Sequence, residues 1–165
     1  AISAPVQELG QIEGLGEAGI AALRCIQAAA LRLAREEVRE SPVLNNWEKL
    51  LAYLNAVMSR ERVEQFRILF LDAKNRLIAD EAQGKGTVNH TPVYPREVVR
   101  RALELQATAL ILVHNHPSGD PNPSRADVDM TREIGQAATM LGIVLHDHLI
   151  IGNGQHYSFR REGHL

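Results

Sequence analysis

Two histidines and an aspartate in the segment HNHPSGDPNPSRAD are the residues whose types and spacing best suit chemistry. Side chains alternate faces along a strand, so His114 and His116, which follow the apolar run ALILV, should project from one face at the strand's carboxyl edge. After seven intervening residues, Ser124 is expected to open a helix, with Asp127 one turn on along the same helical face. This spacing predicts that two imidazoles and a carboxylate meet.

Two histidines and a carboxylate suit a catalytic zinc site, because three protein ligands leave the fourth tetrahedral position for water. Zinc lowers the pKa of that water toward about 7, so a hydroxide nucleophile is available at neutral pH. If the hydroxyl of Ser124 points inward, it could donate a hydrogen bond to the oxyanion that develops on an attacked carbonyl. Ser124 with Asp127 is also an ordinary N-terminal capping arrangement, and the residues alone leave both interpretations open.

The same chemistry needs a general base, which spacing alone does not identify. A nearby glutamate must accept the proton of the water and hand it to the leaving group. Four glutamates are candidates: Glu61, Glu64, Glu97 and Glu104. The choice depends on distances that a sequence does not contain.

Periodicity and turn residues predict the elements that must position these groups. Helices are expected over residues 17–40 and 47–58, from Pro95, and over about 125–140; strands are expected at 65–71, 76–80, 107–113 and near 143–151. The residues DAKN at 72–75 predict a hairpin turn between the first two strands. We therefore expect an α/β domain over residues 41–165, with a mixed sheet flanked by helices, preceded by a helical segment over residues 1–40.

Composition excludes several classes of protein. The 165 residues leave room for one ordinary domain and a small appendage. A net charge of −2 argues against binding nucleic acid through bulk positive charge. Cys25, the single cysteine, can form neither an internal disulfide nor a multi-cysteine zinc site. The apolar runs are too short to span a bilayer and the start lacks a signal pattern, so we expect a cytoplasmic protein that does not bind membranes.

The segment HNHPSGDPNPSRAD, with PREVVRRAL upstream and DHLIIG downstream, resembles the RadC family, bacterial proteins long labelled as DNA repair proteins. The resemblance covers roughly residues 43–165. Its central motif is the JAMM pattern of MPN-type metallopeptidases, whose relatives cut isopeptide bonds to ubiquitin. The resemblance implies a peptidase-like domain with a cytidine-deaminase-like sheet that holds Zn²⁺ through His114, His116 and Asp127. Its expected substrate is a peptide or an isopeptide-linked protein.

The resemblance also bears on the general base and on a second histidine pair. The family pattern places an acid just before a strand that ends in Leu-Asp, and Glu64 precedes QFRILFLD here. Glu64 is therefore the expected base, with Glu97 the next choice. Where the family usually has leucine before Asp147, this chain has His146, which forms a second His-x-His with His148. No Ser-x-x-Asp follows nearby, so His148 is expected to be structural or to support a metal ligand.

Residues 1–40 resemble the second half of a helix-hairpin-helix. Gly14 and Gly16 flank Leu15 just before the predicted helix, and backbone NH groups at such a turn can grip a DNA phosphate. Residues 1–40 hold six acids against four bases, so a DNA contact through Gly14 and Gly16 is expected to be weak. A helical unit that only packs against the domain is the other interpretation.

Three other functions compete with the hydrolase. The principal rival is a non-enzymatic, DNA-repair-associated DNA-binding or scaffold protein that keeps the metal for stability, and turnover separates the two. The contiguous letters HNH do not indicate a nuclease, whose signature is spread over tens of residues. Zinc nucleobase deaminases need a Pro-Cys-x-x-Cys segment that a chain with only Cys25 lacks. The basic residues Arg96, Arg100 and Arg101 fit a solvated helix face better than a site for an acidic partner.

Overall fold

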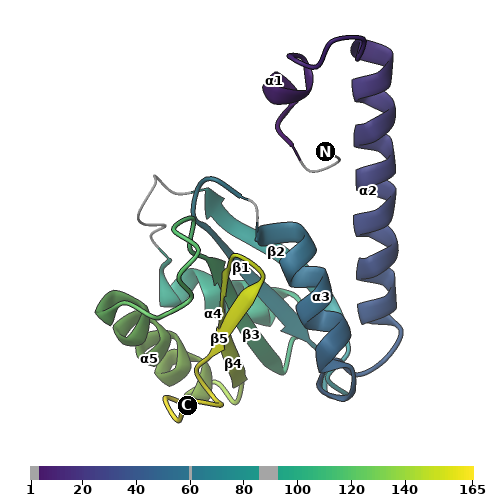
Figure 1. The fold of residues 1–165 in the computed structure, drawn as a ribbon. Helices are drawn as coiled ribbons and strands as arrows, with labels where there is room; N and C mark the ends of the chain where they lie inside the picture. Colours follow the sequence, from purple (N-terminus) through teal and green to yellow (C-terminus); the bar gives the residue numbers. More distant parts are fainter. Residues whose placement is uncertain (1–3, 60, 86–92) are drawn as a thin grey trace.

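The structure is a computed structural model that describes residues 4–59, 61–85 and 93–165. One mixed sheet has the strand order β2-β1-β3-β4-β5, in which β3 and β4 run parallel and the other neighbours run antiparallel (Figure 1). In chain order the elements are α1 (Val6–Leu9), α2 (Glu17–Arg39), the 3-10 helix η1 (Val43–Asn45), α3 (Trp47–Met58), β1 (Gln65–Leu71), β2 (Leu77–Lys85), α4 (Pro95–Glu104), β3 (Ala109–Asn115), α5 (Arg125–Thr139), β4 (Val144–Gly152) and β5 (Gln155–Ser158).

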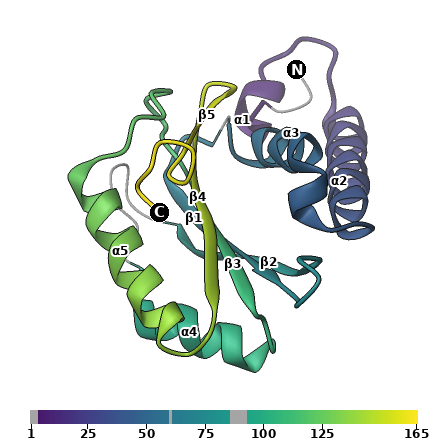
Figure 2. The ribbon, with the colours of Figure 1, turned by 90° about the horizontal axis from the view of Figure 1, so that it is seen from below.

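Helices cover both faces of the sheet, as expected from the sequence. Figure 2 shows α4 and α5 on one side of the strands and α3, with α2 outside it, on the other. The central strand β3 is buried along its whole length, with Leu110 and Leu112 in the core beneath α4 and α5 and Ile111 and Val113 in the core beneath α3. Because both faces of β3 are covered, its apolar side chains do not alternate with polar ones, which explains the continuous apolar run in the sequence.

Strand pairing sets the positions of the candidate site residues. β1 and β3 pair antiparallel with Phe66 opposite His114. The turn from β1 into β2 is held by Asp72, whose Oδ1 accepts hydrogen bonds from the amides of Lys74 and Arg76, and Asn75 in it has a φ of 57°. The predicted hairpin turn is therefore confirmed. α5 connects the parallel strands β3 and β4, so its first turn lies at the carboxyl end of β3.

Some element boundaries differ from the predicted ones. The strand predicted at 107–113 begins at Ala109 and continues to Asn115, and Ala107 belongs to the turn after α4, where its amide bonds the carbonyl of Ala102. His114 consequently lies inside the strand rather than beyond its end. β2 extends five residues past the predicted end, and α1, η1 and β5 are short elements that the pattern analysis did not resolve.

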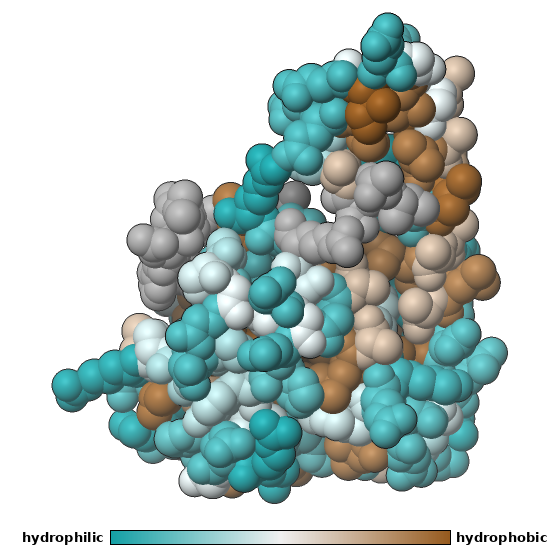
Figure 3. Space-filling model, viewed as in Figure 1, coloured by the Kyte–Doolittle hydropathy of each residue, from teal (hydrophilic) through white to brown (hydrophobic). Residues whose placement is uncertain are grey.

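α2 stands away from the sheet and touches the rest of the domain mainly through α3 (Figure 1). Val38 near its carboxyl end is buried, whereas Ile26 and Leu33 are 56% and 68% exposed. Figure 3 shows apolar surface along this helix. Within the described residues, no helix is both long enough and apolar enough to cross a membrane. The mixed α/β fold with a leading helical segment is confirmed; the domain boundary at residues 40 and 41 stays a prediction.

Candidate metal centre

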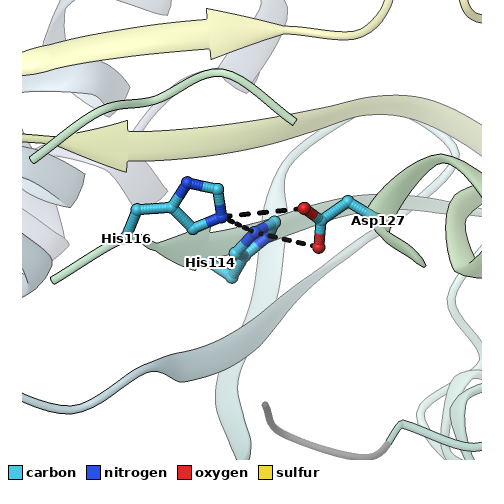
Figure 4. A group of neighbouring side chains, drawn as sticks. All are labelled: His114, His116 and Asp127. Atoms are coloured by element: carbon cyan, nitrogen blue, oxygen red, sulfur yellow. Dashed lines mark hydrogen bonds and ion pairs between the residues drawn. The ribbon is translucent and has the colours of Figure 1, made fainter. Parts of the chain in front are cut away.

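The three predicted metal ligands meet where the carboxyl end of β3 faces the first turn of α5 (Figure 4). His114 Nε2 lies 3.0 Å from His116 Nε2 and 3.3 Å from Asp127 Oδ1, and His116 Nε2 lies 3.6 Å from Asp127 Oδ2. One ligand atom from each residue falls within 4.8 Å of the others. The two imidazoles and the carboxylate thus point at one common space.

The remaining ring nitrogens of both histidines are occupied by other groups. His116 Nδ1 lies 2.8 Å from the carbonyl oxygen of Asp120, and His114 Nδ1 lies 2.8 Å from His148 Nε2. A carbonyl oxygen only accepts hydrogen bonds, so His116 carries its proton on Nδ1. In the neutral ring the lone pair of Nε2 then faces the carboxylate, as a metal ligand requires.

A chain of buried hydrogen bonds fixes the tautomer of His114. The hydroxyl of Thr131 donates to the backbone carbonyl of Asp127 over 2.5 Å, so it must accept from His148 Nδ1, also 2.5 Å away. His148 Nε2 is then an acceptor, and His114 Nδ1 donates to it. This chain leaves the lone pair on His114 Nε2, and it connects the ligand from the strand with the backbone of the ligand from the helix.

Ser124 and Asp127 form the capping arrangement that the sequence left open. Asp127 Oδ2 accepts from both the amide and the hydroxyl of Ser124 at 2.7 Å, and Ser124 Oγ accepts from the amide of Asp127 at 3.2 Å. This reciprocal cap fixes the carboxylate while its Oδ1 faces His114. Because the hydroxyl of Ser124 donates to Asp127 here, its role toward an oxyanion stays a prediction.

Burial and charge divide the site into a neutral inner part and a charged outer part. Burial, opposed by the charge of Asp127, lowers the pKa of His114 to about 4, and burial holds the pKa of His148 well below its usual range. The hydrogen bond with Asp127 raises the pKa of His116. Burial alone would raise the pKa of Asp127, but hydrogen bonds from His116 and Ser124 hold it far below its usual value.

The strand register places Glu64 beside the two histidines. Phe66 with His114 is the last pair of the two strands, and Glu64 lies two residues before Phe66, just ahead of β1, so the same register continued past the ladder would bring Glu64 opposite His116. The charge of Glu64 contributes, after Asp127 and the carbonyl of Asp120, to the raised pKa of His116. This position fits the base expected from the family resemblance, although its catalytic role stays a prediction.

The other candidate glutamates take part in contacts elsewhere. Glu61 accepts a hydrogen bond from the side chain of Gln65. Glu97 and Glu104 pair with arginines along α4, and Arg101 also bonds Glu81 on β2. The basic residues Arg96, Arg100 and Arg101 are therefore each matched by an acid, which fits the solvated helix face expected from the sequence.

Gly14 and Gly16 lie at the start of α2, and Figure 1 shows that this end of α2 is far from α5. Gly14 has a φ of 82°, which favours glycine, and Gly16 is the N-cap of α2 with extended backbone. The turn that the sequence predicted is therefore present. A phosphate contact through its amides stays a prediction.

Sequence reasoning missed two polar residues of this region. Thr131 completes the chain from His148 to Asp127, and Asn115, between the two histidines, bonds the segment that carries Glu64. Asn115 had a visible signal, since it is a polar residue at the end of a strand that is otherwise apolar and buried. Thr131 had none, because one of its partners is a backbone carbonyl of its own helix and the other, His148, lies on β4.

The fold and the His-His-Asp group together define a JAB-type domain. The RadC-like JAB domain family matches residues 44–164, so the chain belongs to the RadC family. Two relatives, each described as a UPF0758 protein, are similar over 164 residues and 99% of this chain. The one from Rhodobacter capsulatus is 59% identical with 77% of its own length covered, and the one from Ruegeria pomeroyi is 55% identical with 73% covered. The expected family is confirmed.

Proposed function

We propose that this protein is a zinc-dependent hydrolase of the JAMM type that cleaves peptide or isopeptide bonds with water. The observation that carries the proposal is the convergence of His114 Nε2, His116 Nε2 and the carboxylate of Asp127, with both Nδ1 atoms engaged elsewhere. Two imidazoles and one carboxylate are the donor set of catalytic zinc sites with an open fourth position. The donors present therefore fit the ion that the family resemblance implies.

The chain's own residues would divide the work as follows. When bound, zinc supplies a Lewis acid that lowers the pKa of a coordinated water toward about 7. Glu64 accepts a proton from the attacking water and passes it to the leaving amine, so the C–N bond breaks without releasing an amide anion. His148 and Thr131 hold His114 in the ligating tautomer. The amide of Ser124 keeps Asp127 oriented, and its hydroxyl, which donates to Asp127 in this structure, would turn to donate to the developing oxyanion.

The proposed activity belongs to residues 41–165, and the helical segment before them is an accessory. A weak DNA contact at Gly14 and Gly16 would connect that segment with DNA repair. A cytoplasmic location agrees with the exposed, unpaired Cys25. The competing function is a scaffold or DNA-binding protein whose metal only stabilises the fold. It predicts zinc uptake without turnover.

Turnover by matched glutamine variants tests the hydrolase. Zinc-loaded wild type would be screened on a panel of linear and isopeptide-linked peptides, together with Glu64→Gln and Glu97→Gln. Glu64→Gln should keep zinc and lose about 10²–10⁴-fold in turnover, whereas Glu97→Gln, in an ion-paired position on α4, should resemble wild type. A dead Glu97→Gln beside an active Glu64→Gln would move the base to Glu97. No cleavage by zinc-loaded wild type would favour the scaffold.

A further inference from the structure

We propose that Asn115 is a positioning residue that fixes the backbone on both sides of Glu64, an inference that rests on the proposed function. Asn115 is only 1% exposed and lies between the two histidine ligands in sequence. Its Oδ1 accepts a hydrogen bond from the amide of Gln65 at 2.9 Å. Its Nδ2 donates to the carbonyls of Val63 at 3.2 Å and Glu61 at 3.4 Å.

These hydrogen bonds begin where the backbone ladder between the strands ends. The last pair between β1 and β3 at this end is Phe66 with His114. One residue further, the side chain of Asn115 bonds the segment before β1. The bonded groups are the amide that follows Glu64 and the carbonyl that precedes it, so the acid is held from both sides.

Alternation along β3 separates the two roles of the HNH segment. His114 projects toward the metal centre, while Asn115, one residue on, projects to the opposite face, on the side of Val113 and α3. Asn115 therefore touches neither the ligand atoms nor the space between them. Its influence on the site would pass through the backbone of residues 61–65.

The carboxamide suits this position because it carries an acceptor and two donors in one plane. Aspartate would keep an acceptor for Gln65 but face the two carbonyls with a negative charge. An apolar residue would leave the buried amide of Gln65 and the two partly buried carbonyls without this partner. A base must lie within hydrogen-bond reach of the proton it takes, and misplacement by about 1 Å can cost about 10²-fold in rate.

Amide hydrogen exchange in the metal-free protein tests the three hydrogen bonds of the Asn115 side chain without any substrate. In Asn115→Ala, the amide of Gln65 should exchange at least about tenfold faster, because its acceptor is gone. In Asn115→Asp it should change less, since an acceptor remains; this variant also serves if Asn115→Ala does not fold. Asn55→Ala, which removes the same side chain from α3, is the control and should leave Gln65 unchanged. Unaltered exchange of Gln65 in Asn115→Ala would overturn the inference.

Acetohydroxamate binding to the zinc-loaded protein tests whether the hydrogen bonds of Asn115 affect the site through Glu64. The hydroxamic acid must give up its proton as it binds, and Glu64 is the expected acceptor. Glu64→Gln and Asn115→Ala should each bind acetohydroxamate about tenfold more weakly than wild type and keep their zinc. The double variant should also lose only about tenfold in affinity, because both changes act through Glu64. Asn55→Ala should bind as wild type does. Wild-type affinity in Asn115→Ala, or a roughly hundredfold loss in the double variant, would contradict the inference.

Zinc content separates failure of this inference from failure of the proposed function. If Asn115→Ala loses zinc while wild type holds it, Asn115 acts on the ligands and the inference is overturned alone. If wild type takes up no zinc, the proposed function is refuted, and the role of Glu64 falls with it. In that case, faster exchange of the Gln65 amide in Asn115→Ala would still establish that Asn115 holds the backbone beside Glu64.

Discussion

Two regions of the molecule, the site around β3 and α5 and the helix α2, differ in how their side chains are buried and paired. At the site, the buried side chains of His114, His148 and Thr131 form a continuous chain of hydrogen bonds. Along α2, apolar side chains such as Leu33 face solvent, and the buried Nε of Arg35 has no hydrogen-bond partner among the residues that the structure describes. Most buried polar groups in proteins are paired, so the dense pairing indicates where the sequence is constrained by chemistry. Each of the following tests challenges that contrast.

The largest effect is expected from removing a metal ligand. Wild type should carry about one zinc per chain, and His114→Ala or His116→Ala should carry none, because two remaining ligands cannot hold the ion tightly. Elemental analysis of protein purified without chelators measures this directly. His164→Ala, at an exposed histidine near the carboxyl terminus, is the control and should keep its zinc. Zinc retained by both ligand variants would refute the assigned site.

Acid should destabilise the metal-free protein through the buried histidines. His114 has a pKa of about 4 in the fold against 6.5 in a model peptide, so the unfolded chain binds more protons between these values. Stability present above pH 6.5 is then lost as pH falls toward 4, by about 3 kcal/mol for this group. His148 shifts in the same direction, whereas His116, whose pKa is raised, contributes stability below pH 6.5 that is lost at higher pH.

Urea unfolding of the metal-free protein between pH 7.5 and about 4.5 checks this dependence. The free energy of unfolding should fall across the range in wild type and fall less in His148→Leu, which lacks one buried imidazole. A flat profile in wild type would show that His116 offsets the buried pair. It would also remove the distinction between inner and outer parts of the site.

A smaller effect is expected from the residue that supports His114. His148→Leu leaves His114 Nδ1 without its acceptor, so the zinc affinity should fall by about 10–100-fold while the stoichiometry at saturation stays the same. His146→Leu is the matched control, two residues away on the same strand, because His146 bonds Asn75 in the β1–β2 turn instead. Competition with a chromophoric zinc chelator measures both affinities. Equal affinities would show that the buried chain does not tune the ligand.

The smallest effect is expected on α2. Leu33→Ala removes a side chain that is 68% exposed, so the free energy of unfolding should change by no more than about 0.5 kcal/mol. Leu112→Ala makes the same change at a fully buried position of β3 and should cost about 2–5 kcal/mol. A large loss in Leu33→Ala would mean that α2 is covered in solution. The contrast between the two regions would then be weaker than the structure indicates.

Local pattern predicted the parts of the molecule whose determinants are near in sequence. The helices from residue 17, from 47 and from Pro95 were predicted correctly, because their apolar periodicity is contiguous in sequence and Pro95 marks the first turn of α4. His114, His116 and Asp127 were expected to meet, and do meet, because they lie within one loop and its flanking elements; their role as metal ligands stays a prediction. Asn115, by contrast, acts on residues about 50 positions away, and that partnership arises only from the pairing of β1 with β3. The hydroxyl of Ser124 could not be placed either, since both of its roles require the same residue pattern.

The separation in sequence between the ligands and Glu64 has a consequence for the order of folding. His114 and Asp127 are 13 residues apart, whereas the contact between Asn115 and Gln65 spans 50. Closing the longer loop costs more chain entropy, by about 0.6 kcal/mol for each doubling. We expect the ligands to gather before Glu64 arrives, so that refolding protein captures Co²⁺ before the fluorescence of Trp47 reaches its native value. Metal bound at that stage would hold the end of β3 against the first turn of α5 while the longer loop closes.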